Sequence, residues 1–216
     1  MVLSIEERIK GFLFNPSETF DASKEDTLGD AFKYFVFILI IYTALTSVIS
    51  VAYSMIGWKA GPWAPIVVAM SPLLSVASFI WGLILGISGV LIGALWTHIW
   101  AYVVGGRKGV EQTIKALMYA STPMYLMGWI PFVILISGWL PIAIPGWFVL
   151  AIWTLIVGII GIRQLQELST GRAILALILA IIIPAIIIGA IFAAYIPTLP
   201  MLRPGPGLGP EHMIRP

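Results

Sequence analysis

The chain has 216 residues, of which 60% are hydrophobic and only 10% are charged, whereas soluble domains carry about 25% charged residues. A soluble fold could not bury that much apolar surface, so the composition predicts one all-α integral membrane domain. The formal net charge of +2 is spread along the chain, which argues against a nucleic-acid partner, and the absence of cysteine excludes disulfides and thiolate metal sites.

The segment 1–33 is charged and precedes the first long apolar run, so it is predicted to be cytoplasmic. Ser4 with Glu7 has the spacing of a helix capping box, and a second box pairs Asn15 with Glu18. The two short amphipathic helices that follow are expected to lie along the membrane surface. Because the segment has seven acidic and four basic residues, apolar contact or packing on the bundle must hold it there. The simpler interpretation is that these helices only lead the chain into the membrane.

Long charge-free runs predict a bundle of five transmembrane helices. Their predicted bounds are 34–57, 74–104, 115–137, 141–162 and 173–196. Pro65 and Pro72 predict that residues 62–73 form a broken entry along the interface, ahead of the second span. The last residues, 197–216, are rich in Gly and Pro and are predicted to be a flexible tail outside the membrane.

The distribution of Lys and Arg predicts the orientation, because these residues are retained on the cytoplasmic side. With five spans, nine basic residues lie inside and three outside, whereas splitting the run 66–104 into two spans would leave six on each side. The chain is therefore expected to be a multi-pass protein of the cell membrane, with its N-terminus in the cytoplasm and its C-terminus outside.

Small and hydroxyl-bearing residues recur at spacings of three and four in the second span, a pattern that predicts a helix-packing seam. The seam comprises Ser75, Ser78, Gly82, Gly86, Gly89, Gly93 and Thr97. The first span carries a matching hydroxyl stripe, which comprises Thr43, Ser47, Ser50 and Ser54. Packing between two helices is the simpler interpretation. The alternative is that the two stripes line the narrow polar path of a channel or carrier.

His98 is the ionisable side chain that is predicted to lie well inside a span, and such a residue is a candidate functional group. It also lies near a cytoplasmic loop and beside the aromatic residues Trp96 and Trp100, so a structural, hydrogen-bonded role is the simpler interpretation. The spans contain no deep carboxylate, zinc-binding motif or paired catalytic group. We therefore predict no enzymatic activity, metal or cofactor.

Four segments carry a family resemblance: L-F-N-P-S-E-T-F at 13–20, G-G-R-K-G at 105–109, Q-T-I-K-A-L-M-Y-A-S-T-P at 112–123, and residues 161–173. In order and content they resemble the Yip family of Ypt- and Rab-interacting membrane proteins, over residues 5–195, and the short cysteine-free chain looks like a prokaryotic or archaeal member. The resemblance implies five spans and a cytoplasmic N-terminus.

Eukaryotic members of that family carry an Asp-Leu-Tyr-Gly-Pro motif before the first span, whereas this chain has Asp26-Thr27-Leu28-Gly29-Asp30 at the comparable place. Binding of a Rab-type GTPase therefore does not follow from the resemblance. The candidates for facing a cytoplasmic partner are Asp26, Gly29, Asp30 and Arg107.

The predicted function is that of a non-catalytic scaffold or adaptor in the lipid bilayer, which organises partners or bilayer shape. The candidate partners are other membrane or cytoplasmic proteins and further copies of the chain. The alternative function is a channel or facilitator for a small solute or ion.

Overall fold

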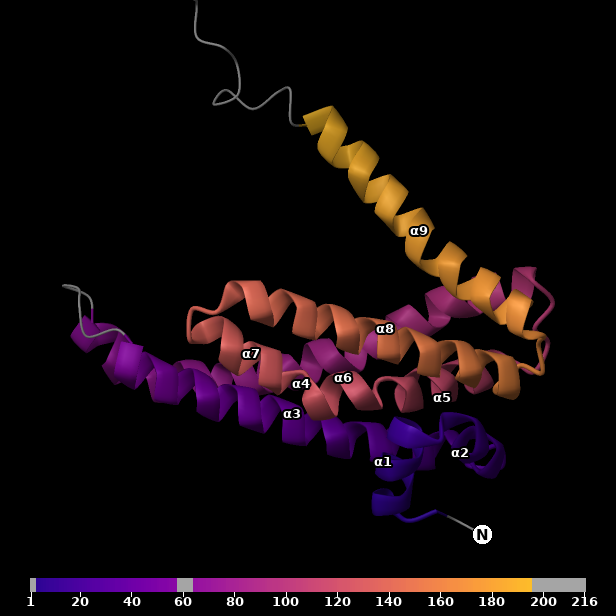
Figure 1. The fold of residues 1–216 in the computed structure, drawn as a ribbon, viewed down its shortest axis with the longest axis horizontal. Coiled ribbons are helices and arrows are strands. Elements are labelled where there is room, and N and C mark those ends of the chain that lie inside the picture. The colour runs from indigo at the N-terminus through magenta and orange to yellow at the C-terminus, as the bar shows by residue number, and fades with distance from the viewer. Residues whose placement is uncertain (1–2, 58–63, 196–216) are drawn as a thin grey trace, which may run out of the picture. The chain divides into compact units, whose positions relative to one another are not determined.

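The computed structural model describes residues 3–57 and 64–195, without the side chains of residues 54–57, 64 and 67. The described residues form helices and no strands, and Figure 1 shows their order along the chain. The helices are α1 (Ile5–Phe14), α2 (Pro16–Ala22), α3 (Leu28–Gly57), α4 (Ala64–Val103), α5 (Val110–Ala120), α6 (Thr122–Met127), α7 (Trp129–Ile136), α8 (Leu140–Leu165) and α9 (Thr170–Tyr195).

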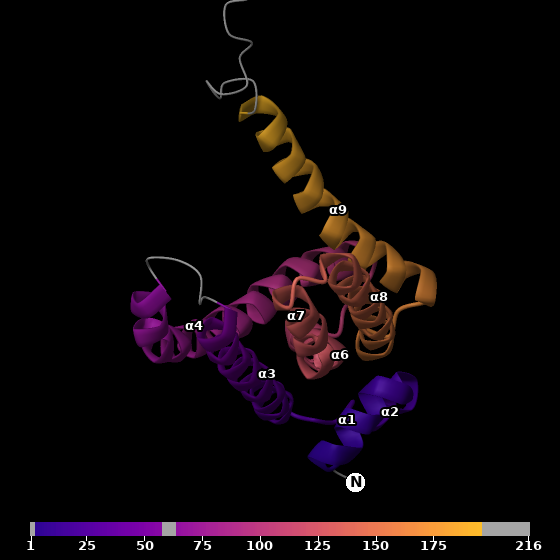
Figure 2. The same cartoon turned by 60° about the vertical axis from the view of Figure 1, so that its left-hand side comes forward.

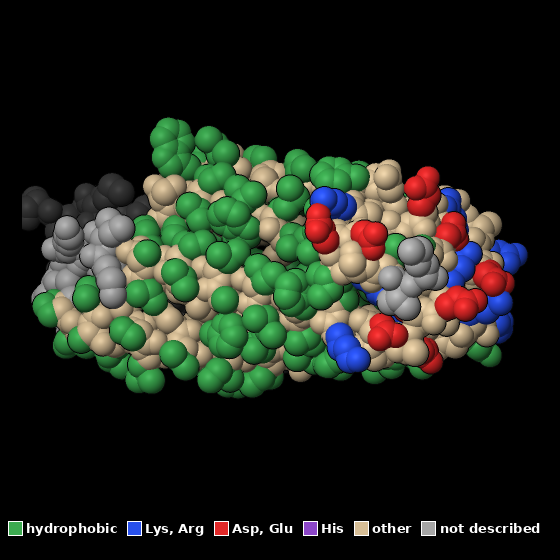
Figure 3. Space-filling view, turned by 90° about the horizontal axis from the view of Figure 1, so that it is seen from below, with side chains coloured by type: hydrophobic (Ala, Val, Ile, Leu, Met, Phe, Trp, Pro, Cys, Tyr) green, Lys and Arg blue, Asp and Glu red, His purple; other side chains and the backbone are tan. Residues whose placement is uncertain are grey.

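Five stretches of the described chain are long and apolar enough to cross a membrane, which confirms the predicted class of all-α membrane protein. These candidate spans are Leu28–Tyr53, Val68–Val103, Val110–Ile136, Leu140–Leu165 and Thr170–Ala194. Figure 3 shows that Lys, Arg, Asp and Glu side chains gather toward one end of the molecular face it presents, while hydrophobic side chains predominate over the rest of its described part. That separation is typical of a bundle whose apolar surface meets lipid.

The chain divides into two compact units, residues 1–177 and 178–216. In the first unit the core lies where α1 and α2 meet α3, α5 and α8, and its largest buried side chains include Phe12, Phe20, Phe35 and Tyr119. Figures 1 and 2 show α1 and α2 side by side at one end of the long helices. The described part of the second unit, 178–195, is the remainder of α9.

Helix α4 is continuous through Pro72, whereas the sequence predicts a broken entry over 62–73. A proline has no N–H, so the carbonyl of Val68, four residues before it, loses its helical partner. The hydroxyl of Ser71 donates to that carbonyl at 2.8 Å. Because a hydroxyl replaces the missing donor, the helix continues at this point. Residues 62 and 63 lie outside the described part of the chain.

The third span, predicted as a single helix over 115–137, consists of three helices, α5, α6 and α7, separated at Ser121 and Gly128. Pro123 cannot donate to the carbonyl of Tyr119, and the hydroxyl of Thr122 does so instead at 2.6 Å. Unlike at Pro72, the chain does not continue as one helix here. All three helices of this span contact α3 and α8, whereas the contacts with α4 are concentrated on α5.

Helix α3 begins at Leu28, ahead of the predicted start of the first span at residue 34. Thr27 and Asp30 cap this end, because the Thr27 hydroxyl accepts from the N–H of Asp30 at 3.2 Å and the Asp30 carboxylate accepts from the N–H of Thr27 at 3.2 Å. The same pair is joined side chain to side chain at 2.6 Å. The predicted tail, 197–216, lies outside the described residues.

Candidate functional site

A buried ion pair attaches the N-terminal segment to the helix bundle. The guanidinium of Arg8 on α1 donates to both carboxylate oxygens of Asp26, at 2.7 and 3.0 Å, and the two side chains are only 5% and 8% exposed. Tyr119 on α5 donates its phenol proton to Asp26 at 2.6 Å and accepts a hydrogen bond from Arg8. Burial disfavours the charge on Arg8, but the bonds to Asp26 and Tyr119 outweigh it, so the pKa of Arg8 is raised.

Lys115, also on α5, holds the loop that follows α2. Its ammonium group donates to the backbone carbonyls of Lys24 at 3.0 Å and Asp26 at 2.7 Å, and the residue is 1% exposed. We call Arg8, Asp26, Lys115 and Tyr119 the N-terminal clasp. Every one of these charged or phenolic groups has a partner inside the chain, as buried polar groups require.

Aromatic rings fill the space beside the N-terminal clasp. The ring of Phe12 stacks on Tyr119 with centroids 4.6 Å apart, and Phe20 meets Phe12 edge-on at 4.8 Å. Gly161 on α8 makes room for Phe20, since a methyl group there would lie 2.6 Å from the tip of that ring. The apolar face of the first amphipathic helix thus packs partly on the bundle, while Ile5 on the same helix stays 46% exposed.

A second polar network lies around His98, which the sequence singles out. His98 Nδ1 lies 2.9 Å from the hydroxyl of Thr113, and that hydroxyl accepts from the amide of Gln166 at 2.9 Å. The Gln166 side chain also donates to the carbonyl of Gly109 at 2.7 Å and accepts from the N–H of Lys108 at 3.1 Å. We call His98, Thr113 and Gln166 the histidine network. It connects the end of α4 to α5 and to the end of α8.

The predicted packing seam on α4 meets α3 over only part of its length. A methyl group at Gly82 would lie 2.7 Å from Thr43 Cγ2, and one at Gly86 would lie 2.6 Å from Leu39 Cδ1, so both glycines lie tightly against α3. Nothing lies within 4 Å of such a methyl group at Gly89 or at Gly93. The close approach of the two helices therefore depends on the half of the seam nearer Ser78.

The other members of the seam lie as follows. The hydroxyls of Ser75 and Ser78 donate to the carbonyls of Ser71 at 2.8 Å and Ser75 at 2.9 Å. Thr97 is buried, with 5% of its surface exposed. These groups satisfy their own helix or lie inside the bundle.

The hydroxyl stripe of α3 borders a groove of about 470 Å³ between α3, α4 and the third span, which we call the hydroxyl groove. Its lining includes Tyr42, Thr43, Thr46, Ser47 and Ser50 from α3, Ser78, Gly82, Leu85 and Gly86 from α4, and Leu39, Tyr125 and Phe132. The structure thus brings three of the stripe residues together with three of the seam residues. The side chain of Ser54 lies outside the described residues.

The hydroxyls of the stripe bond mainly to their own helix. Thr43 donates to the carbonyl of Leu39 at 2.8 Å, and Ser50 donates to that of Thr46 at 2.7 Å. Ser47 is the exception, because its oxygen lies 3.2 Å from that of Ser78 on α4. Among the described side chains, one hydrogen bond therefore joins the stripe to the seam.

The four candidates for facing a cytoplasmic partner differ in their surroundings. Asp26 is directed inward to the N-terminal clasp, and Asp30 caps α3, while Gly29 is exposed. Arg107 is exposed, donates to the carbonyl of Gly106 at 3.0 Å and lies over the ring of Tyr102, 3.8 Å from its centroid. Asp26 is therefore the one of the four that a partner could not reach without displacing a bond of a buried cluster.

Five residues of these networks carry no functional prediction from the sequence: Arg8, Thr113, Lys115, Tyr119 and Gln166. A signal for part of this set is present, because Lys115 stands at the start of the predicted third span, where a charged side chain needs a partner. The partners of Arg8 and Gln166 lie far away in sequence, beyond the reach of any local pattern.

The described residues contain no group of three or more His, Cys, Asp or Glu side chains that could hold a metal ion. The N-terminal clasp joins elements instead of presenting a reactive group, because its carboxylate is bonded to both a guanidinium and a phenol.

Among the comparisons with known proteins, the sequence model of one family, described as the Yip1 domain, matches residues 10–193. No curated protein and no solved structure matches this chain.

Proposed function

The chain belongs to the Yip1 domain family, and from this premise we propose that it is a non-catalytic scaffold or adaptor, embedded in the membrane, that presents a fixed cytoplasmic platform to a partner protein. The platform is the segment 3–27, which comprises α1, α2 and the loop to α3. The observation that carries this proposal is the N-terminal clasp, because Arg8, Asp26, Tyr119 and Lys115 bond the segment to the third span.

A second contact supports a fixed position for the platform. The hydroxyl of Ser17 on α2 accepts from the amide of Gln164 at 2.8 Å and from Arg163 at 3.2 Å, both on α8. The platform is therefore bonded to two different spans. A segment that merely led the chain into the membrane would need neither set of bonds.

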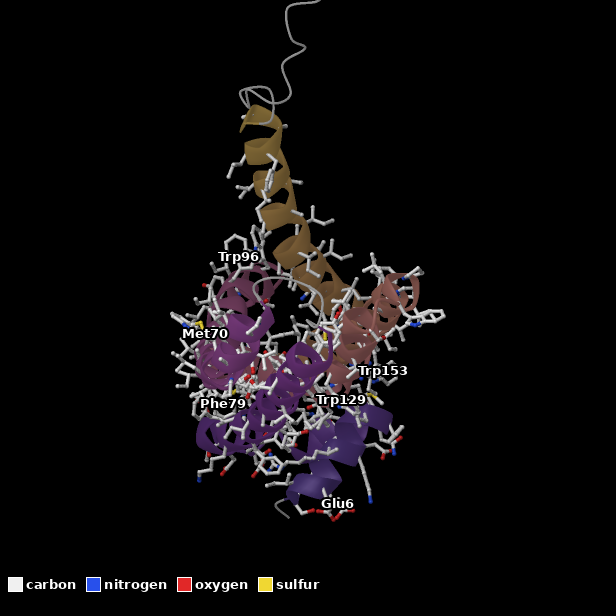
Figure 4. The ribbon with its side chains drawn as sticks, turned by 90° about the vertical axis from the view of Figure 1, so that its left-hand side faces the viewer. Glu6, Met70, Phe79, Trp96, Trp129 and Trp153 are labelled. Carbon is white, nitrogen blue, oxygen red and sulfur yellow. The ribbon has the colours of Figure 1, made fainter. Side chains whose placement is uncertain are left out.

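The outer surface of the platform supports a role in binding. A shallow cleft between α1 and α2 is lined by Glu7, Lys10, Phe14 and Glu18, among others. Phe14 is 75% exposed, and Glu18 has no hydrogen bond or ion pair with a described residue. Figure 4 shows Glu6 at the free end of α1, away from the labelled residues of the spans. An exposed aromatic ring is a suitable contact for a protein partner, because aromatic residues are enriched at the core of protein interfaces.

The proposed orientation places this platform in the cytoplasm, because nine of the twelve basic residues then lie inside. Since the chain has no cysteine, single cysteines can report each side. In intact cells, a membrane-impermeant thiol reagent should label Trp139→Cys, in the exposed turn between α7 and α8, and should leave Glu6→Cys unlabelled until the cells are opened. Labelling of Glu6→Cys in intact cells would reverse the orientation.

The function itself is tested with a photo-crosslinking amino acid in place of Phe14, and a matched control in place of Trp139, which is 62% exposed in the turn between α7 and α8. A discrete protein adduct should form at residue 14 and not at residue 139, and it should weaken when Asp26→Asn loosens the platform. Purified protein in liposomes should pass no ion or small solute. Solute flux through the wild-type protein would favour a channel or facilitator instead.

A further inference from the structure

The hydroxyl groove lies deep in the membrane-spanning part of the chain and has no charged lining residue among those described. Tyr42 stands near the middle of the candidate span Leu28–Tyr53, and Ser50 nearer its far end. A charged ligand would find no counter-charge there, and burying an unpaired charge in a bilayer is costly. The groove therefore suits an uncharged ligand.

Two phenol groups in the groove have no hydrogen-bond partner among the described residues. Tyr42 and Tyr125 are half-buried and their rings meet edge-on, with centroids 5.3 Å apart, but neither hydroxyl is bonded. In hydrocarbon an unbonded hydroxyl costs several kcal/mol. Each phenol proton is therefore available to an acceptor oxygen that the ligand supplies.

The hydroxyls of α3 in the groove can act as hydrogen-bond acceptors for a ligand. Thr46 and Ser50 have already donated their protons to carbonyls of their own helix, so only their oxygen lone pairs are free. A ligand hydroxyl matches both sets, since it can accept a proton from a tyrosine and donate its own to Thr46 or Ser50. An ether or an ester could do only the first.

The rest of the lining is apolar and open to the side. Leu39 and Phe132 contribute hydrocarbon walls, and Leu85 at the edge of the groove is 63% exposed on the surface that meets lipid. A volume of about 470 Å³ lies within the usual range of ligand pockets. An occupant can thus enter from the bilayer and keep its apolar body in contact with these walls.

We propose that the hydroxyl groove binds an uncharged membrane lipid that carries a free alcohol, of which diacylglycerol is the representative. Tyr42 and Tyr125 donate to the lipid alcohol, Thr46 or Ser50 accepts from it, and Leu39, Leu85 and Phe132 contact its acyl chain. This site is separate from the cytoplasmic platform and does not depend on the proposed adaptor function.

The test uses full-length protein in phosphatidylcholine nanodiscs and a diacylglycerol whose acyl chain carries a diazirine near the glycerol. Illumination should label peptides that contain Tyr42–Ser50 or Tyr125–Phe132, and excess unlabelled diacylglycerol should compete, whereas triacylglycerol should not. The double variant Tyr42→Phe/Tyr125→Phe keeps both rings and should lower labelling about three- to tenfold, in line with the loss of one or two hydrogen bonds. Tyr102→Phe, outside the groove, is the control and should label like the wild type.

Three results would overturn the proposal. Equal labelling by the acetylated form of the probe would show that only apolar contact is involved. Competition by glycerol from the water phase, at concentrations that leave the nanodisc intact, would assign the groove to a soluble polyol. Unchanged labelling of the folded double variant would show that the two phenol groups do not contribute to binding. If that variant does not fold, the competition between diacylglycerol and triacylglycerol on the wild type decides.

Discussion

The N-terminal clasp and the hydroxyl groove are both polar regions inside an apolar bundle, yet they treat their polar groups in opposite ways. In the clasp the carboxylate of Asp26 and the phenol of Tyr119 bond to each other and to Arg8. In the groove the phenols of Tyr42 and Tyr125 bond to no described residue. Polar groups that bond to one another hold parts of the chain together, whereas polar groups without a partner can form hydrogen bonds with another molecule.

Removing one charge from the clasp is expected to have the largest effect on stability. Asp26→Asn leaves the guanidinium of Arg8 buried without its counter-ion, and breaking a buried pair in this way costs about 3–5 kcal/mol. We expect a large loss of thermal stability in detergent, together with rapid proteolysis ahead of α3.

The matched control is the exposed pair Lys10 with Glu6, whose side chains are 69% and 77% exposed. Lys10→Ala should cost little, because such surface pairs contribute about 0–1 kcal/mol. The double change Arg8→Met with Asp26→Leu should recover part of the loss, since it leaves no unpaired charge. Equal effects of Asp26→Asn and Lys10→Ala would mean that the clasp does not hold the segment.

The second prediction concerns the contact that forms one wall of the groove. Gly86→Leu places a side chain where even a methyl group would lie 2.6 Å from Leu39, so α3 and α4 must separate at an expected cost of about 1–3 kcal/mol. Gly89→Leu is the control, because nothing lies within 4 Å of a methyl group there. Thermal unfolding of both variants in detergent gives the comparison. A similar loss at Gly89 would extend the packing seam beyond the part that contacts α3.

The sequence predicts the class, the five apolar spans and the family, because composition and hydropathy depend on many residues at once. It predicts helix continuity less well. Ser71 beside Pro72 and Thr122 beside Pro123 supply the same replacement bond, but α4 continues and the third span divides. A proline and its neighbouring hydroxyl therefore do not by themselves decide whether a helix continues.

The candidate sites could also be predicted only in part. The hydroxyl stripe and the packing seam repeat with the helical period, so each is recognisable within one segment of sequence. Thr43, Ser47 and Ser50 do line one groove with Ser78 and Gly82. The N-terminal clasp follows no local sequence repeat, because Arg8 and Tyr119 are 111 residues apart. Such a pair becomes visible only once the helices are placed together.

The third prediction concerns the histidine network. Thr113→Val keeps the shape of the side chain and removes the hydroxyl that serves both His98 and Gln166, so the half-buried His98 and the buried Gln166 each lose a partner. We expect a loss of about 1–3 kcal/mol. Thr46→Val is the matched control, because the Thr46 hydroxyl bonds only to carbonyls of its own helix. Thermal unfolding should rank Thr113→Val below Thr46→Val, and the reverse order would argue against a structural role of the network.

The smallest effect is expected at the hydrogen bond between Ser47 and Ser78, which joins the stripe to the seam. Ser78 has a single hydroxyl proton, which it donates to the carbonyl of Ser75 at 2.9 Å, so Ser47 is the donor in the contact of 3.2 Å between their oxygens. Ser47→Ala removes that donor and leaves Ser78 still bonded, while Ser78→Ala deprives Ser47 of its acceptor. Each change should cost about 0.6 kcal/mol, the average for hydrogen bonds between helices in a membrane. The double variant should cost no more than Ser78→Ala alone if Ser47 bonds only to Ser78. Unfolding in detergent measures all three, and a cost well above about 2 kcal/mol for Ser47→Ala would show that this hydroxyl has a further partner in the groove.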